Sequence, residues 1–92
     1  MRIIGRLPHP EMMITVFSND GRFPVQFELQ GQTQQYRFRH GPEMRNLADV
    51  RRIVDDRFVA DVLAIFREMR QAQARVNASH FAPPEDELPD IL

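Results

Sequence analysis

Phe23-Pro24-Val25-Gln26-Phe27-Glu28-Leu29-Gln30 is the stretch that decides the fold, because its apolar residues alternate with polar residues or proline. A period of two predicts a β-strand with one face in a core and the other toward water. The turn dipeptides Asp20-Gly21 and Gly31-Gln32 flank the stretch on its two sides. The stretch is therefore predicted to be the central strand of an antiparallel meander.

One register of the neighbouring segments gives apolar pairs on both sides of this strand. The expected pairs are Val16–Val25, Ile14–Phe27, Phe38–Val25 and Tyr36–Phe27. A slip of one residue would turn each of these side chains toward water, so their agreement supports three strands. With Gly31-Gln32 as a tight turn, hydrogen-bond parity requires a wider first loop, residues 19–22. Residues 2–7 are a candidate fourth strand with no assigned partner.

Residues 47–76 carry the period of about 3.6 that indicates helix. The apolar positions before Asp55 and those after it centre on azimuths about 120° apart, so one straight helix would have to twist its apolar face. A break at this point removes the mismatch. We expect a short helix from Leu47 to Val54 with Asn46 as its N-cap, and a longer, Asp-capped helix from Asp56 to about Val76.

The change of period predicts an α+β fold. We expect a three-stranded or four-stranded antiparallel β-meander, followed by a short and a long C-terminal helix that pack on one sheet face. A content of 42% hydrophobic and 27% charged residues fits a globular chain. Residues 1–78 are expected to form a single domain. Residues 79–92 read as an acidic, Pro-rich tail that is flexible or docks in a groove.

Composition narrows the classes of protein to which the chain can belong. The chain has no cysteine, which excludes disulfide frameworks and thiolate sites. It has no run of apolar residues long enough to span a membrane, and its first residues lack the pattern of a signal peptide. We therefore expect a cytoplasmic protein without a membrane contact.

Candidate catalytic residues are sparse. The histidines, His9, His40 and His80, are far apart in the chain and show no metal-ligand spacing. The adjacent acids Asp55 and Asp56 suit the start of a helix better than acid–base work. No glycine-rich phosphate loop or nucleophile motif is present. We expect no enzyme activity, no cofactor and no metal.

The long helix has an apolar arc wider than the cover of a small sheet requires. This leaves Val59, Leu63 and Phe66 as candidates for contact with a second copy or another protein. The alternative is that the short helix covers these three side chains. Either arrangement follows from the same periodicity.

The outer sheet face offers a second candidate surface. Met13 and Phe17 are its apolar residues, and Arg37 and Arg39 would form a polar rim. Together with the helix residues, these four support the expectation of a protein–protein interaction module, built as a homodimer, whose biological process stays open.

Nucleic-acid binding is the alternative function. The segment Gln35-Tyr36-Arg37-Phe38-Arg39-His40 interleaves aromatic and basic residues, as many nucleic-acid-binding strands do. In the expected register, however, Tyr36 and Phe38 point into the core while the arginines point out. A formal net charge of −1 also argues against general affinity for phosphate.

Overall fold

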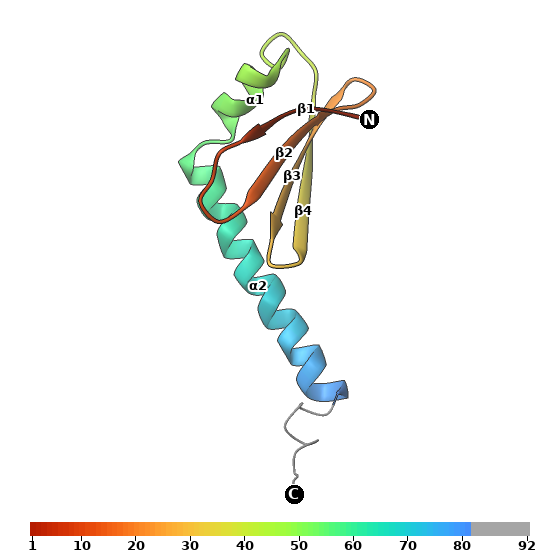
Figure 1. Ribbon diagram of the computed structural model, residues 1–92, viewed down its shortest axis with the longest axis vertical. Coiled ribbons are helices and arrows are strands. Elements are labelled where there is room, and N and C mark those ends of the chain that lie inside the picture. Colours follow the sequence, from red (N-terminus) through yellow and green to blue (C-terminus); the bar gives the residue numbers. More distant parts are fainter. Residues whose placement is uncertain (82–92) are drawn as a thin grey trace, which may run out of the picture.

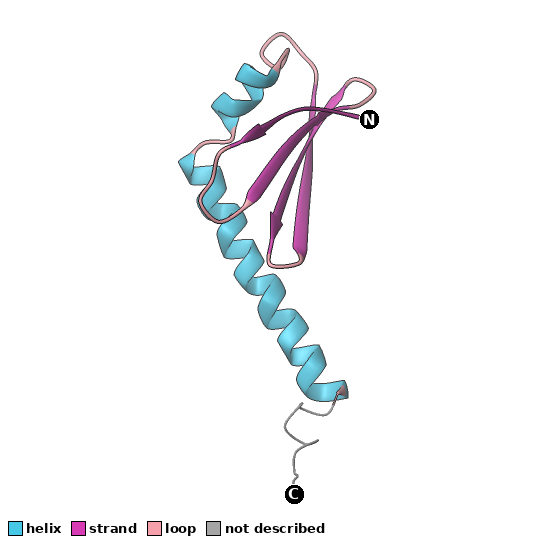
Figure 2. Ribbon diagram, viewed as in Figure 1, coloured by secondary structure: helices cyan, strands magenta, loops and turns pink. Residues whose placement is uncertain are grey.

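The computed structural model describes residues 1–81 and shows one antiparallel sheet followed by two helices (Figures 1 and 2). The strands, in their order across the sheet, are β1 (Arg2–Leu7), β2 (Met13–Ser18), β3 (Arg22–Leu29) and β4 (Gln32–Arg39). The helices are α1 (Leu47–Ile53) and α2 (Asp56–His80). The predicted α+β fold class is confirmed, and residues 2–7 form the fourth strand, antiparallel to β2.

The first hairpin has the predicted register but not the predicted loop. Its pairs include Ile14–Phe27 and Val16–Val25. Asp20 and Gly21 alone form the turn, with φ angles of 53° and 78°. Asn19 and Arg22 exchange both of their backbone hydrogen bonds, at 2.9 and 3.0 Å. The expectation of a wider loop is therefore wrong: this is a tight two-residue turn of the kind whose twist suits a hairpin.

The predicted register of the second hairpin is wrong by two residues. Gln30 and Gly31 form the turn, at φ 50° and 81°, instead of Gly31-Gln32. The resulting pairs are Leu29–Gln32, Phe27–Gln34, Val25–Tyr36 and Phe23–Phe38. Because the displacement is even, every side chain keeps its predicted face. With the turn at Gln30-Gly31, the odd-numbered residues of β3 hydrogen-bond to β4 and the even-numbered residues face β2. Arg22 can therefore bond to Asn19, so that a two-residue loop closes each hairpin.

Gly5 lets α1 approach the sheet closely. The β1–β2 register shifts between Ile3 and Gly5, as at a β-bulge. A Cβ built on Gly5 would lie 2.5 Å from Cδ2 of Leu47, the first residue of α1. The missing side chain therefore makes room for Leu47 on β1.

The predicted break between the two helices is confirmed. Asn46 Oδ1 accepts a hydrogen bond from the backbone N–H of Asp49 (3.0 Å), and Asp55 Oδ1 accepts one from Phe58 (2.9 Å). These contacts satisfy backbone donors at the two helix starts. Helix α2 runs to His80, beyond the predicted end, so the first residues assigned to the tail are helical; residues 82–92 of that tail lie outside the described residues.

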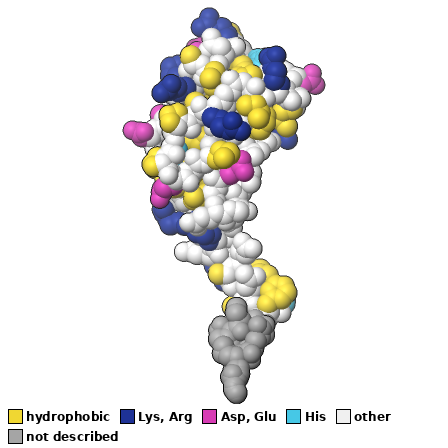
Figure 3. All heavy atoms as spheres, viewed as in Figure 1, with side chains coloured by type: hydrophobic (Ala, Val, Ile, Leu, Met, Phe, Trp, Pro, Cys, Tyr) yellow, Lys and Arg dark blue, Asp and Glu magenta, His cyan; other side chains and the backbone are white. Residues whose placement is uncertain are grey.

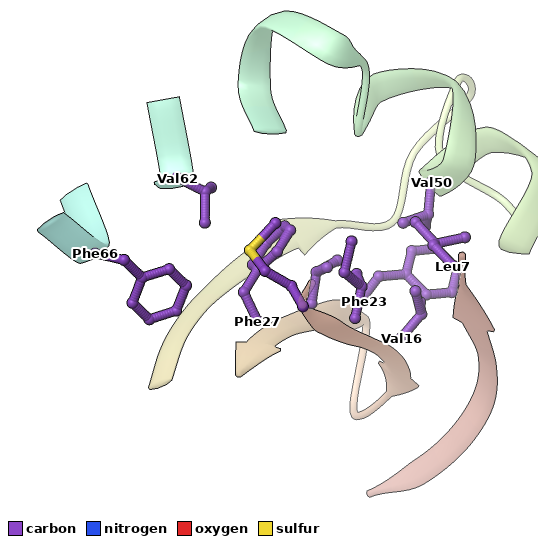
Figure 4. Packing of buried hydrophobic residues seen from close by; sticks show 10 residues of the cluster. Leu7, Val16, Phe23, Phe27, Val50, Val62 and Phe66 are labelled. Carbon is purple, nitrogen blue, oxygen red and sulfur yellow. The ribbon is translucent and has the colours of Figure 1, made fainter. Parts of the chain in front are cut away.

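Both helices cover the same face of the sheet. In Figure 4, Val50 of α1 lies over Leu7 at one end of the core, while Val62 and Phe66 point from α2 toward Phe27. All five side chains are buried. The core thus has two neighbouring parts, one under each helix.

Gln34 is a polar residue on the core-facing side of β4. It is only 8% exposed, and its Nε2 donates to the backbone carbonyl of Val62 at 2.9 Å. Its Oε1 accepts a hydrogen bond from the hydroxyl group of Tyr36. Since both ends of the buried amide have partners, Gln34 ties β4 to α2 without leaving a buried polar group unsatisfied.

Candidate interaction surface

Helix α2 is longer than the sheet that it covers, and its C-terminal part extends beyond it (Figure 1). Every residue from Gln71 to Phe81 is exposed. A hydrogen bond from Gln32 Nε2 to Gln73 Oε1 (3.2 Å) joins the β3–β4 turn to the start of this segment. Residues 71–80 are called the protruding helix below.

An apolar stripe runs along α2 into the protruding helix. Ile65, Met69, Ala72 and Val76 follow one another at intervals of four, three and four residues. These intervals keep side chains on one side of a helix and match the a and d positions of a heptad repeat. Ile65 is 40% exposed and Val76 is 52% exposed, whereas Met69 is half-buried and Ala72 is exposed. We call these four residues the apolar seam.

Local propensity accounts for the helix but not for the seam. Between Gln71 and Arg75 the chain is composed of alanine, glutamine and arginine, which are strong helix formers. A helix held by propensity alone has no need of apolar side chains at heptad intervals. The spacing of the seam is instead typical of a helix that packs against another helix.

Phe66 is a correction to the sequence-based expectation. Its side chain has no exposed area, and it points into the core toward Phe27 (Figure 4). It is therefore not presented to a partner, because the sheet already covers it. Val59 and Leu63 are half-buried and pack against the same core. Val59 also lines a hollow together with Val54, at the junction of the two helices.

The two apolar residues predicted for the outer sheet face, Met13 and Phe17, are separated. Met13 is 52% exposed and Phe17 is half-buried, beside Ile3 of β1. They are four residues apart on β2, a distance of about 13 Å along a strand. A polar row crosses the sheet between them, consisting of Arg6, Thr15, Gln26 and Gln35. Met13 and Phe17 therefore do not form one continuous apolar patch.

Arg37 and Arg39 are exposed on β4, on the face away from the helices. Tyr36 and Phe38 point to the opposite face, where their ring centroids lie 5.1 and 6.2 Å from that of Phe58. These aromatic rings cannot stack on a base that is bound beside the arginines. On the face shown in Figure 3, hydrophobic and basic side chains are interspersed over the sheet and α1.

Two of the histidines line hollows in the surface. His9 and Asp56 line one of about 280 Å³, together with Arg51. The Nδ1 atom of His9 accepts hydrogen bonds from the backbone N–H groups of Glu11 and Met12, at 3.0 and 3.1 Å. Within residues 1–81, no hydrogen bond or ion pair joins His9 to Asp56. His40 lines a separate hollow. Ser18 lines that hollow too, but among residues 1–81 no hydrogen bond joins its hydroxyl group to His40. Neither hollow therefore shows a nucleophile that is activated by a hydrogen-bonded base.

The described part of the chain contains no group of three or more His, Asp or Glu residues placed to hold a metal ion. Among residues 1–81 there is also no helix with the length and apolar character needed to cross a bilayer. No protein-family model, curated protein or solved structure matches the chain. Function has to be argued from the chemistry of the exposed surface.

Sequence reasoning missed the seam as a unit. Ile65 and Met69 belong to the apolar arc that periodicity reveals, but Ala72 and Val76 come after Met69, the last residue of that arc, and Val76 is the expected end of the helix. The interval pattern of four, three and four was the available signal. The pattern covers only four residues, and it indicates an exposed surface only if the sheet does not cover that part of α2.

Proposed function

We propose that the protein acts by contact with protein, as a homodimeric interaction module of the cytoplasm without catalysis of its own. The observation that carries the proposal is the apolar seam on a helix that extends past its own sheet. Burying an exposed aliphatic side chain contributes about 1 to 2 kcal/mol, so covering Ile65 and Val76 favours association. Both side chains remain substantially exposed in the single chain.

The seam is a better candidate for contact than the outer sheet face. Its members are consecutive on one side of a helix, whereas a polar row separates Met13 from Phe17 on the sheet. A heptad-spaced stripe also suits a partner helix of the same kind. A second copy of the chain provides such a helix.

Nucleic-acid binding through the outer sheet face is the second candidate. The exposure of Arg37 and Arg39 on one face of β4 favours it. The opposite orientation of the neighbouring aromatic rings and the net charge of −1 weigh against it. We therefore rank it below self-association.

Light scattering coupled to size-exclusion chromatography, over a dilution series, tests the proposal. We expect the unaltered protein to form dimers and the Val76→Asp variant to be a folded monomer, because a charge in the seam would lose its hydration on association. Gln71→Asp is the matched control, since it adds the same charge to the same helix on the side away from the seam. Circular dichroism checks that both variants remain helical.

Two results would overturn or redirect the proposal. A monomer at every concentration of the unaltered protein would remove its basis. A salt-dependent mobility shift of random DNA or RNA that is lost in an Arg37→Gln, Arg39→Gln double variant would favour the second candidate instead. Phe66→Asp is unsuitable as a probe of association because it would bury a charge in the core.

A further inference from the structure

The direction in which two copies pair can be inferred from the chemistry of α2. Resting on the proposed homodimer, we infer that the seams of two chains pack antiparallel, with the two-fold axis between residues 70 and 71. In this arrangement Ile65 lies opposite Val76 of the second copy, and Met69 lies opposite Ala72. Each contact occurs twice, as two-fold symmetry requires.

Charge complementarity supports the antiparallel direction. Glu68 and Arg75 both lie at the g position, which flanks the seam when Met69 and Val76 occupy a positions. In an antiparallel pair of helices, g positions face g positions of the other chain. Each Glu68 then faces an Arg75 of the second copy, which gives two opposite-charge pairs.

A parallel pair lacks these charge contacts. There, g positions face the e positions of the partner helix, five residues further along. Glu68 would face Gln73, and Arg75 would face His80. No carboxylate would meet an arginine across the seam.

Side-chain volume supports the same direction. The antiparallel layers combine a long Met69 with a small Ala72, and Ile65 with Val76, so the volume of successive layers is balanced. A parallel pair would place Ala72 against Ala72 and Met69 against Met69. Such a seam alternates between underfilled and crowded layers, which costs packing energy.

The position of the sheet on α2 is compatible with this dimer. Val62, Phe66 and Gln73 mark the side of α2 that meets the sheet. At about 100° per residue, the seam lies about 70° further round the helix. The sheet and a partner helix can therefore pack on neighbouring sides of α2. The antiparallel direction also places the two sheets at opposite ends of the dimer.

Single-cysteine variants test the direction, because the unaltered chain contains no cysteine. Ile65→Cys and Val76→Cys are made separately, mixed, equilibrated under reducing conditions and then oxidised. We expect a disulfide between the two variants to be the main product. The Val76→Cys variant alone should cross-link poorly, because its two sulfur-bearing positions would lie about 16 Å apart along the helices, beyond the reach of a disulfide.

Charge variants provide an independent measurement. In Glu68→Arg homodimers and in Arg75→Glu homodimers, both facing pairs become like charges, so we expect each to dissociate roughly tenfold more readily at low salt. The double variant Glu68→Arg, Arg75→Glu should recover affinity. Mixing the two single variants should give mainly the heterodimer, in which both facing pairs have opposite charge.

The outcomes separate this inference from the proposed function. If the unaltered chain is a dimer but Val76→Cys cross-links efficiently to itself, the helices are parallel and only the antiparallel inference is overturned. The antiparallel inference is also overturned if the unaltered chain is a dimer but mixing the two charge variants gives no excess of heterodimer. If the unaltered chain is monomeric at every concentration, both the inference and the proposed function are wrong.

Discussion

Gln30 has a backbone conformation that glutamine rarely adopts. Its φ angle of 50° lies in the left-handed region, and Gly31 beside it has φ 81°. For most residues with a Cβ this conformation costs about 1 to 2 kcal/mol, while glycine and asparagine adopt it more readily. The turn that sets the β3–β4 register therefore contains an unfavourable residue at its first central position.

Replacing Gln30 with Asn should stabilise the protein. The change produces the Asn-Gly pair that two-residue hairpin turns prefer, and we expect the free energy of unfolding to rise by about 0.5 to 1 kcal/mol. Urea denaturation measures the change. Gln35→Asn is the control, because Gln35 lies in extended β4, where asparagine is disfavoured. A lower stability of Gln30→Asn would contradict this account of the turn.

At the scale of the secondary-structure element, the start of α1 depends on an ionised carboxylate. Oδ2 of Asp49 accepts a hydrogen bond from the backbone N–H of Arg45 at 2.8 Å, and this contact is the main cause that lowers the pKa of Asp49. The guanidinium groups of Arg45 and Arg52, 3.4 and 3.9 Å from its oxygens, lower the pKa further. Desolvation opposes these effects.

The lowered pKa makes part of the stability dependent on pH. The unfolded state, in which the Asp49 pKa is near 3.8, binds a proton more readily than the folded state does. The contribution of Asp49 is therefore present above about pH 4 and is lost as the pH falls through the folded-state value. We expect the difference in unfolding free energy between the unaltered protein and Asp49→Asn to shrink as the pH is lowered from neutral to about 3.

Urea denaturation at several pH values measures this difference. Arg45→Gln is an informative companion variant because it removes the guanidinium group but keeps the backbone N–H that contributes most. In Arg45→Gln, most of the Asp49-dependent loss of unfolding free energy at low pH should therefore remain. A difference between the unaltered protein and Asp49→Asn that stays constant with pH would show that Asp49 acts through its shape alone.

Among residues 1–81, the molecule consists of a sheet covered by two helices, of which α2 continues beyond the sheet (Figure 1). The covered part buries its apolar side chains within one chain. The protruding helix has no such cover among the described residues. Its stability should therefore depend on the second copy more strongly than that of the sheet does.

Association should raise the thermal stability of the proposed dimer in proportion to the logarithm of concentration. A partner that binds the folded chain and not the unfolded chain shifts unfolding by mass action. We expect the unfolding midpoint of the unaltered protein to rise with protein concentration, and that of Val76→Asp to stay constant. Calorimetry over a concentration series measures both. An equal dependence in the two proteins would show that Val76 lies outside the interface.

The sequence by itself determined the secondary-structure elements and their faces. Alternation in residues 23–30 and the helical period after residue 47 are local properties, as are the caps at Asn46 and Asp55, so they could be predicted from the chain alone. The β3–β4 register could not, because two turn placements preserved the same faces. The structure has the turn at Gln30-Gly31 although the backbone of Gln30 is unfavourable there, so local turn chemistry did not select it.

Coverage of the helix was decided by the tertiary structure alone. Periodicity gives the direction of a side chain around α2 but not the point at which the sheet ends. The sheet covers Phe66, which sequence reasoning placed in an interface, and leaves Ile65 and Val76 exposed. Burial depends on the relative placement of elements distant in sequence, and that placement follows from packing the whole core.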